Sequence, residues 1–291
     1  MSKKLKTLCA LICTAAIMLT MCLSVSGIFL EGANINTATS AGFEDVPVYL
    51  NGRFMGNALK SGGTSYVPID SFCENILAQN CSLRWDSDES TLTVASDSFE
   101  LSLDLMLHYI SINGRCLYLS GGVYNIDGTV YVPIRPIAAA LGVSLSLANR
   151  EDGLLIRLNY REGSSIESGE TFYNSEDLYW LSRVIYSESG NQPLTGMIGV
   201  GNVVLNRVKN SSFPDSVYDV IFQQGQFSVV DNGMIYSTPS EQAVIAAKLC
   251  LEGCNTVGDS LFFLNPEISS SAWFDSCRIF RMSIGEHYFY A

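Results

Sequence analysis

The spacing of apolar positions changes partway along the chain. Between residues 43 and 160, apolar and polar residues alternate in short runs such as Thr91–Val94, with Gly, Asp and Ser between the runs. This pattern is typical of short β-strands joined by tight turns. Residues 161–173 are mostly Gly, Ser and Glu, which indicates a linker. From residue 174 to residue 291 the spacing becomes mainly helical, so we expect two domains.

The C-terminal domain is predicted to place its helices first and a small sheet last. Asn174 is a suitable N-cap, and Leu181, Val184 and Ile185 follow at helical spacing until Gly190. The same reasoning predicts further helices after Pro193, after Pro214 and from an N-cap at Thr238 to about Glu252, and strands over Ser260–Leu264 and Arg278–Tyr290. This order predicts the α+β class.

The N-terminal domain contains an internal repeat. Asn51-Gly52-Arg53 recurs as Asn113-Gly114-Arg115, and the Val-Pro-Ile segment ending at Ile69 recurs at Ile134. Each copy predicts short strands, a short helix after Val-Pro-Ile, and a strand pair. Over residues 43–160 this β-rich duplicated unit resembles the copper amine oxidase N-terminal-like domain, a stalk on exported Gram-positive enzymes. The resemblance implies a spacer or wall adaptor. His108 is the only histidine in this part of the chain, so we expect no copper site.

The first residues indicate export. Lysines at positions 3, 4 and 6 precede an uncharged apolar run from Leu8 to Val25, and small residues follow. This pattern predicts a signal peptide over residues 1–27, followed by a polar segment over 28–42. An uncleaved membrane anchor is the alternative. The mature protein would be secreted, in an oxidising compartment where a local Cys73–Cys81 disulfide is allowed but not required.

The chain is acidic, with 17 Lys and Arg against 29 Asp and Glu and a net charge of −12. Loss of residues 1–27 removes three lysines and brings the charge to −15. Nucleic-acid binding needs a basic surface, so we expect no nucleic-acid partner. We also expect no attraction to anionic wall polymers, and no membrane contact other than through an uncleaved anchor.

Glu188 is the residue that the pattern singles out for chemistry. It lies four residues after Val184 and seven after Leu181, on the apolar face of the predicted helix. Burial there would raise the pKa of the carboxyl group and make it a general acid. The alternative is a helix that frays at Ser187 and leaves Glu188 in solvent. In the next helix, Gly196, Gly199 and Gly201 are expected to serve close packing rather than ligand binding.

An ordered series of motifs accompanies Glu188. It comprises Val184–Pro193, Gly199–Val208, Phe213-Pro214, Val220-Ile221, Gly225–Ser228, Asn265-Pro266 and Gly285–Tyr290. Over about residues 176–291 this series resembles the SleB/CwlJ-type cell wall hydrolase family. The resemblance implies a lysozyme-like α+β fold related to lytic transglycosylases. It also implies cleavage of the MurNAc–GlcNAc bond of peptidoglycan glycan strands, in several members those of the spore cortex, with roles in sporulation and germination.

The resemblance also assigns site residues. Glu188 becomes the catalytic acid/base, and the substrate-binding candidates are Ser189, Gln226, Phe227, Asn265 and His287. The commoner family pattern has a second glutamate where this chain has Gln192, which cannot supply a carboxylate. A lytic transglycosylase needs one acid/base, whereas a hydrolytic muramidase needs a second carboxylate, for which Asp231 is the family-like candidate.

Other classes of function fit the sequence less well. A Cys–His peptidase would pair His287 with Cys250, Cys254 or Cys277, none of which has a nucleophile motif. Zinc hydrolysis would need ligand spacings that are absent, so we expect no metal and no cofactor. The runner-up is a non-catalytic wall-binding or spore-assembly module, with a cell-wall or spore-coat protein as partner of the stalk.

Overall fold

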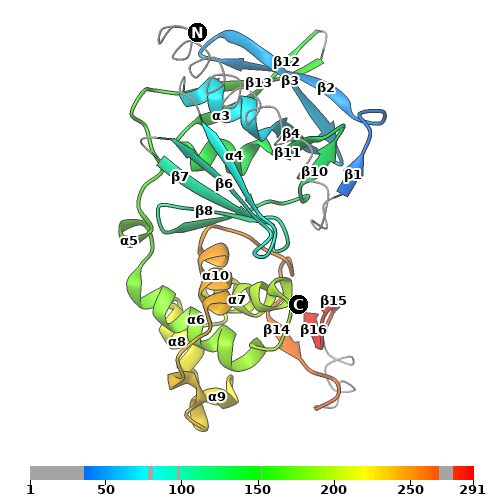
Figure 1. Cartoon of the computed structure of the whole chain (residues 1–291). Helices are drawn as coiled ribbons and strands as arrows, with labels where there is room; N and C mark the ends of the chain where they lie inside the picture. Colours follow the sequence, from blue (N-terminus) through cyan, green and yellow to red (C-terminus); the bar gives the residue numbers. More distant parts are fainter. Residues whose placement is uncertain (1–35, 78–80, 97–98, 152, 269–277) are drawn as a thin grey trace, which may run out of the picture. The chain divides into compact units, whose positions relative to one another are not determined.

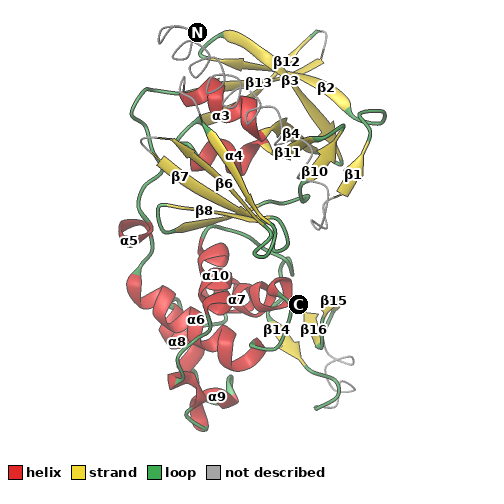
Figure 2. Ribbon diagram, viewed as in Figure 1, coloured by secondary structure: helices red, strands yellow, loops and turns green. Residues whose placement is uncertain are grey.

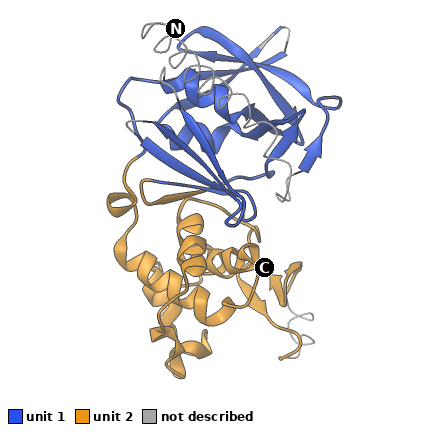
Figure 3. Ribbon diagram, in the orientation of Figure 1, with its two compact units in different colours: residues 1–112, 119–166 blue, residues 113–118, 167–291 orange. Residues whose placement is uncertain are grey.

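The computed structural model describes residues 36–77, 81–96, 99–151, 153–268 and 278–291 (Figure 1). The predicted signal peptide and Cys277 lie outside these ranges. The chain divides into two compact units, residues 1–112 with 119–166 and residues 113–118 with 167–291 (Figure 3). Figure 2 shows that strands dominate the first unit and helices the second. The predicted α+β class is confirmed.

The first unit is built on an eight-stranded sheet in the order β1-β10-β11-β4-β3-β2-β13-β12. Its strands are β1 (Asn36–Ala38), β2 (Glu44–Leu50), β3 (Arg53–Ser61), β4 (Thr64–Pro68), β10 (Tyr124–Ile126), β11 (Thr129–Pro133), β12 (Ser144–Arg150) and β13 (Gly153–Asn159). A second antiparallel ladder joins β5 (Ser82–Asp86), β6 (Thr91–Ser96), β7 (Phe99–Asp104) and β8 (Tyr109–Ile112). The strand predictions for this region are confirmed.

The repeat appears as two matching sets of turns and helices. Asn51 and Gly52 have φ values of 50° and 83°, and Asn113 and Gly114 have 49° and 76°. Asn-Gly pairs tolerate these left-handed angles, which a two-residue hairpin turn requires. Each Val-Pro-Ile segment leads from a strand into a helix, α3 (Ile69–Leu77) or α4 (Ile134–Ala140). The first unit is therefore a duplicated β-rich structure, as the sequence predicts.

The second unit places three long helices around an apolar core. These are α6 (Ser175–Ser189), α7 (Leu194–Val208) and α10 (Glu241–Leu251), with the shorter α5 (Gly169–Phe172), α8 (Val217–Phe222), α9 (Ser228–Asp231) and 3₁₀ helix η1 (Met234–Tyr236). The side chain of Asn174 accepts hydrogen bonds from the backbone N–H groups of Glu176 and Asp177, and this cap begins α6 as predicted. Because α6 runs to Ser189 before Gly190, Glu188 is part of the helix.

The glycines of α7 serve close packing. A Cβ on Gly201 would lie 2.7 Å from Cys250 Sγ and 2.8 Å from the Cδ1 atom of Ile185. A Cβ on Gly199 would come equally close to a buried aromatic ring, that of Phe289. The helices therefore approach α7 more closely than any side chain would allow, which confirms the packing interpretation.

A three-stranded sheet completes the second unit, in the order β14-β16-β15. Its strands are β14 (Phe262–Leu264), β15 (Phe280–Ile284) and β16 (His287–Tyr290). The buried Phe289 of β16 packs with Val203 of α7 and with Val257. This contact holds the β15–β16 hairpin against α7. Gln192 lies just before the first residue of α7. Both predicted strand regions are confirmed.

The short strand β9 (Arg115–Tyr118) belongs to the second unit, although the sequence places it within the repeat. Arg115 forms a half-buried bidentate ion pair with Glu252, and both N···O distances are 2.6 Å. Tyr173 donates a third hydrogen bond to the same carboxylate at 2.8 Å. These contacts tie residues 113–118 to the end of α10, and the repeat pattern alone gives no sign of them.

Two sequence predictions need correction, and the disulfide that the sequence allows but does not require is not formed. The N-cap of α10 is Ser240, whose Oγ accepts from the N–H of Ala243, so the helix begins two residues later than a Thr238 cap implies. Cys73 and Cys81 are both thiols with no bond between them. The stretch 161–173 is not wholly irregular, because it contains α5.

Among the helices that the structure describes, none has the length and apolar character of a membrane span.

Candidate functional site

A cavity of the second unit has Glu188 in its wall. Its volume is about 510 Å³, and it opens between α6, the loop before α9, and the β14 and β15–β16 segments. Its lining residues are Glu188, Asn191, Gln192, Arg207, Gly225, Gln226, Phe227, Ser228, Phe263, Leu264, Asn265, Ile268, Glu286 and His287. Polar groups dominate this lining, as binding a hydroxyl-rich substrate requires.

Glu188 has the environment of a general acid. It lies in the last turn of α6, and its carboxyl group is largely withdrawn from water. Burial raises the pKa of Glu188 from 4.5 to about 7, and no charged neighbour contributes to the shift. The preceding Ser187 donates a hydrogen bond to the backbone oxygen of Met234 at 3.0 Å, so η1 is held against this end of α6. A carboxyl group with a pKa near neutrality can both give and take a proton.

Four of the five substrate-binding candidates line the same cavity as Glu188. They are Gln226, Phe227, Asn265 and His287, which come from separate parts of the sequence. Ser189 differs: it is fully buried, and its hydroxyl donates to the backbone oxygen of Ile185 at 2.7 Å. Because that hydrogen bond engages the hydroxyl inside the helix, Ser189 is not placed to contact a substrate.

The candidates have distinct environments. Gln226 is exposed in the turn before α9, whereas the ring of Phe227 is buried beside Phe263. His287 is buried, and its Nδ1 has no hydrogen-bond partner in the part of the chain that the structure describes. Burial lowers the pKa of the imidazole, while Glu286 opposes that shift. Packing therefore explains part of the placement of Phe227 and His287.

Sequence reasoning missed Glu286, a second carboxylate in the cavity wall. Its Oε2 accepts hydrogen bonds from the side-chain amides of Gln192 and Asn265, each at 3.2 Å. Its backbone N–H donates to Oε1 of Gln192 at 2.8 Å. A Cβ on Gly285 would collide with that same oxygen, so glycine is required in this turn. The buried Gln192 therefore positions the carboxylate of Glu286.

Arg207 is the second residue that the sequence reasoning missed. It lies within the Gly199–Val208 motif, and the fold rather than the motif brings its side chain to the cavity wall. By contrast Asp231, the sequence candidate for a second carboxylate, is exposed on α9 and is not part of the cavity lining. The second carboxylate in this wall is Glu286.

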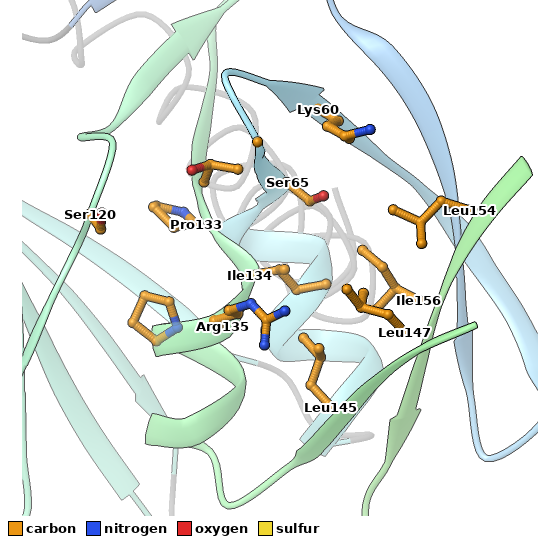
Figure 4. Close-up of a pocket in the computed structure, with 13 residues that line it drawn as sticks. Lys60, Ser65, Ser120, Pro133, Ile134, Arg135, Leu145, Leu147, Leu154 and Ile156 are labelled. Carbon is orange, nitrogen blue, oxygen red and sulfur yellow. The ribbon is translucent and has the colours of Figure 1, made fainter. Parts of the chain in front are cut away.

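The first unit offers a cavity of different character. Its volume is about 190 Å³, and Figure 4 shows apolar side chains around it with Lys60 and Arg135 as its charged residues. No carboxyl or imidazole group is among its lining residues. This cavity therefore has no buried carboxyl group comparable to Glu188.

The structure describes two of the three cysteines that the peptidase alternative names, whereas Cys277 lies outside the described residues. Cys250 is buried in the core, its Sγ contacts the backbone oxygen of Ile198 at 3.3 Å, and burial raises the pKa of the thiol well above its usual range. Burial also raises the pKa of the Cys254 thiol, to about 11. Neither lines the cavity. Among the described residues there is no cluster of three or more His, Cys, Asp or Glu side chains able to hold a metal ion.

The second unit is thus an α+β domain with one strongly perturbed carboxylic acid in a polar cavity, the arrangement of an acid–base catalyst. Its residues 191–290 match the model of the Cell Wall Hydrolase family, and residues 40–156 match that of the Copper amine oxidase N-terminal domain. The chain therefore carries a domain of the cell wall hydrolase family, preceded by a copper amine oxidase N-terminal domain. The first match begins after Glu188, so the evidence for that residue is geometric.

Individual relatives agree with the family. The spore cortex-lytic enzyme of Bacillus cereus is 34% identical over 128 residues, which is 44% of this chain and 48% of that protein. The Bacillus subtilis enzyme of the same name is 32% identical over 101 residues, 35% of this chain and 33% of that protein. The chain thus spans about half the length, or less, of these curated relatives.

Two solved structures are similar to this chain in sequence. One is the catalytic domain of the germination-specific lytic transglycosylase SleB from Bacillus anthracis, 34% identical to this chain. The match covers 43% of this chain and all of that domain, with a TM-score of 0.39. The catalytic domain of Bacillus cereus SleB is 35% identical, covering 41% of this chain and 92% of that one, with the same TM-score.

Proposed function

We propose that this protein cleaves the MurNAc–GlcNAc bond of peptidoglycan as a lytic transglycosylase, with Glu188 as its single acid/base. The observation that carries the proposal is the largely buried carboxyl group of Glu188, with a pKa of about 7, in the wall of a polar cavity. The relationship of this domain to spore cortex-lytic enzymes and to the SleB lytic transglycosylase supports the choice of substrate.

The reaction needs one proton donor that becomes a proton acceptor. The carboxylic acid of Glu188 protonates the bridging oxygen, and the bond from that oxygen to C1 of MurNAc breaks. The resulting carboxylate then takes the proton of the MurNAc C6 hydroxyl as its oxygen attacks C1. A 1,6-anhydro sugar forms, and Glu188 regains its proton. A pKa near 7 suits both halves of the cycle.

The second candidate function is hydrolysis of the same bond, and Glu286 is the observation that favours it. A muramidase needs a second carboxylate to activate water or to stabilise the sugar cation. Glu286 lines the cavity with Glu188 and is held by the amides of Gln192 and Asn265. Replacing Glu286 with Gln separates the two functions, because it would abolish hydrolysis and leave anhydro-forming cleavage in place.

The setting of the reaction is also part of the proposal. The protein would be exported through residues 1–27 and act on spore cortex or cell wall of a Gram-positive bacterium. Residues 43–160 would serve as a stalk that binds a wall or coat protein, with residues 161–173 as the connection to the catalytic domain at 174–291. Because the chain carries a net charge of −12, we expect binding to sparsely charged cortex to exceed binding to the anionic vegetative wall.

A dye-release assay on purified cortex and vegetative wall tests the proposal. We expect the wild-type protein to release glycan fragments and Glu188→Gln to lose activity by a factor of roughly 100 to 10,000. Glu176→Gln, an exposed carboxylate on the same helix, is the matched control and should retain activity. Binding without release by the wild type on both substrates would instead identify a non-catalytic wall-binding module.

A further inference from the structure

Arg207 is a buried cation in the wall of the site cavity. It lies in the last turn of α7, and only 5% of its surface is exposed. Its Nε donates to the backbone oxygen of Leu261 at 2.8 Å, while its buried Nη1 has no hydrogen-bond partner among the described residues. The ion pairs found among the described residues all involve other side chains.

The surroundings of Arg207 tolerate the charge but do not neutralise it. The rings of Phe213, Phe227 and Phe262 have their centroids 5.1–5.4 Å from the guanidinium carbon. Ring faces attract cations weakly, and the nearby end of α7 adds a partial negative charge. Burial lowers the pKa of Arg207 to about 10, so the group is still charged at neutral pH. A buried charge without an ionic partner is costly unless an anion joins it.

The guanidinium group of arginine matches a carboxylate in shape and charge. Arg207 and Glu188 line one cavity, and none of the ion pairs found among the described residues joins them. Because the two side chains are not paired with each other, each is available to a different part of a molecule bound in the cavity. An anion held by Arg207 would leave the acid function of Glu188 intact.

We propose that Arg207 binds a carboxylate of the glycan at a subsite separate from the bond that Glu188 breaks. The inference rests on the proposed function, because MurNAc is the sugar of that substrate with a carboxyl-bearing lactyl group. The carboxylate is supplied either by a free lactyl group or by the end of a peptide attached to it. The second unit has few basic residues, so this attraction is local and does not depend on a basic surface.

The test compares substrates that differ in these carboxylates. Peptide-free glycan presents lactyl carboxylates and intact glycan presents peptide carboxylates, and each is also prepared with its carboxylates capped as methylamides. A charge-assisted hydrogen bond changes affinity by a factor of roughly 10 to 100. We expect capping to lower kcat/KM of the wild type by that factor for one of the two substrates. The substrate that responds identifies whether the carboxylate belongs to the lactyl group or to the peptide.

The Arg207 variants separate binding from packing. Arg207→Gln should cleave capped and uncapped glycan at equal rates, and Arg207→Lys should keep part of the preference. Arg281→Gln is the control: it removes a positive charge from the exposed ion pair with Asp259 and should keep the full preference for uncapped glycan. A wild type indifferent to capping overturns the proposal, as does a preference that survives in Arg207→Gln. If Arg207 had only a structural role, Arg207→Gln would lower the stability of the protein and leave the preference for uncapped glycan unchanged.

Binding to the inactive Glu188→Gln protein keeps this test independent of catalysis. Equilibrium dialysis should show tighter binding of uncapped than of capped glycan, and free N-acetylmuramic acid should compete where N-acetylglucosamine does not. If this preference holds but no variant cleaves glycan, the proposed function fails and the carboxylate subsite stands. If Arg207→Gln does not fold, equal binding of capped and uncapped glycan to the Glu188→Gln protein still overturns the subsite.

Discussion

Replacing Glu188 with Gln should stabilise the second unit at alkaline pH and not at acidic pH. The folded-state pKa of Glu188 is about 7, against an ordinary value of 4.5. The folded protein therefore holds the proton more tightly than the unfolded chain, and stability falls as pH rises from about 4.5 to about 7. The difference corresponds to about 3 kcal/mol of lost stability above pH 7. Gln stays neutral at every pH and avoids this loss.

Hydrogen exchange of α7 amides at about pH 4 and about pH 8 measures the effect, because these buried amides report the unfolding of this unit. We expect the variant and the wild type to agree at the lower pH and to differ by about 3 kcal/mol at the higher pH, with the variant more stable. Glu176→Gln is the control and should show no such change between the two pH values. If the stability difference between Glu188→Gln and the wild type were the same at both pH values, the burial of this carboxyl group would be refuted.

Three further predictions test other parts of the account. As pH rises through about 7, kcat/KM should fall as Glu188 loses its proton, approaching tenfold per pH unit, which a pH–rate profile measures. Gln192→Glu should loosen the β15–β16 turn by roughly 1–3 kcal/mol, because a donor to Glu286 becomes a second carboxylate; faster exchange of the Glu286 amide would show it. Gly201→Val should destabilise the unit by roughly 1–3 kcal/mol in thermal unfolding, because its side chain would overlap Cys250 and Ile185.

The features that are predictable from the sequence are those with a local cause. Asn113-Gly114 specifies a tight turn because few residues tolerate positive φ, and the structure has that turn. Glu188 could be found because helical spacing decides which face it occupies. The cap of α10 was placed wrongly because Thr238 and Ser240 are both good caps, and spacing alone does not choose between them.

The features that the sequence conceals depend on residues far apart in the chain. The role of Gln192 follows from its contacts with Glu286, 94 positions later, and no periodicity predicts that pair. The sequence indicates only that Arg207 is a polar residue near the end of a helix. The fold brings the rings of Phe227 and Phe262 to its guanidinium group. Motif order predicted which loops meet at the site, but it could not predict which side chains within them make hydrogen bonds.

Mass spectrometry of the glycan fragments tests the central claim most directly. Digestion of purified cortex by the wild-type protein should give fragments that end in 1,6-anhydro-MurNAc, each lighter by one water than a hydrolytic product, and Glu188→Gln should give none. Reducing MurNAc ends from the wild type would contradict the transglycosylase mechanism and point to hydrolysis with Glu286. Anhydro ends from the Glu188→Gln protein would contradict the assignment of the acid.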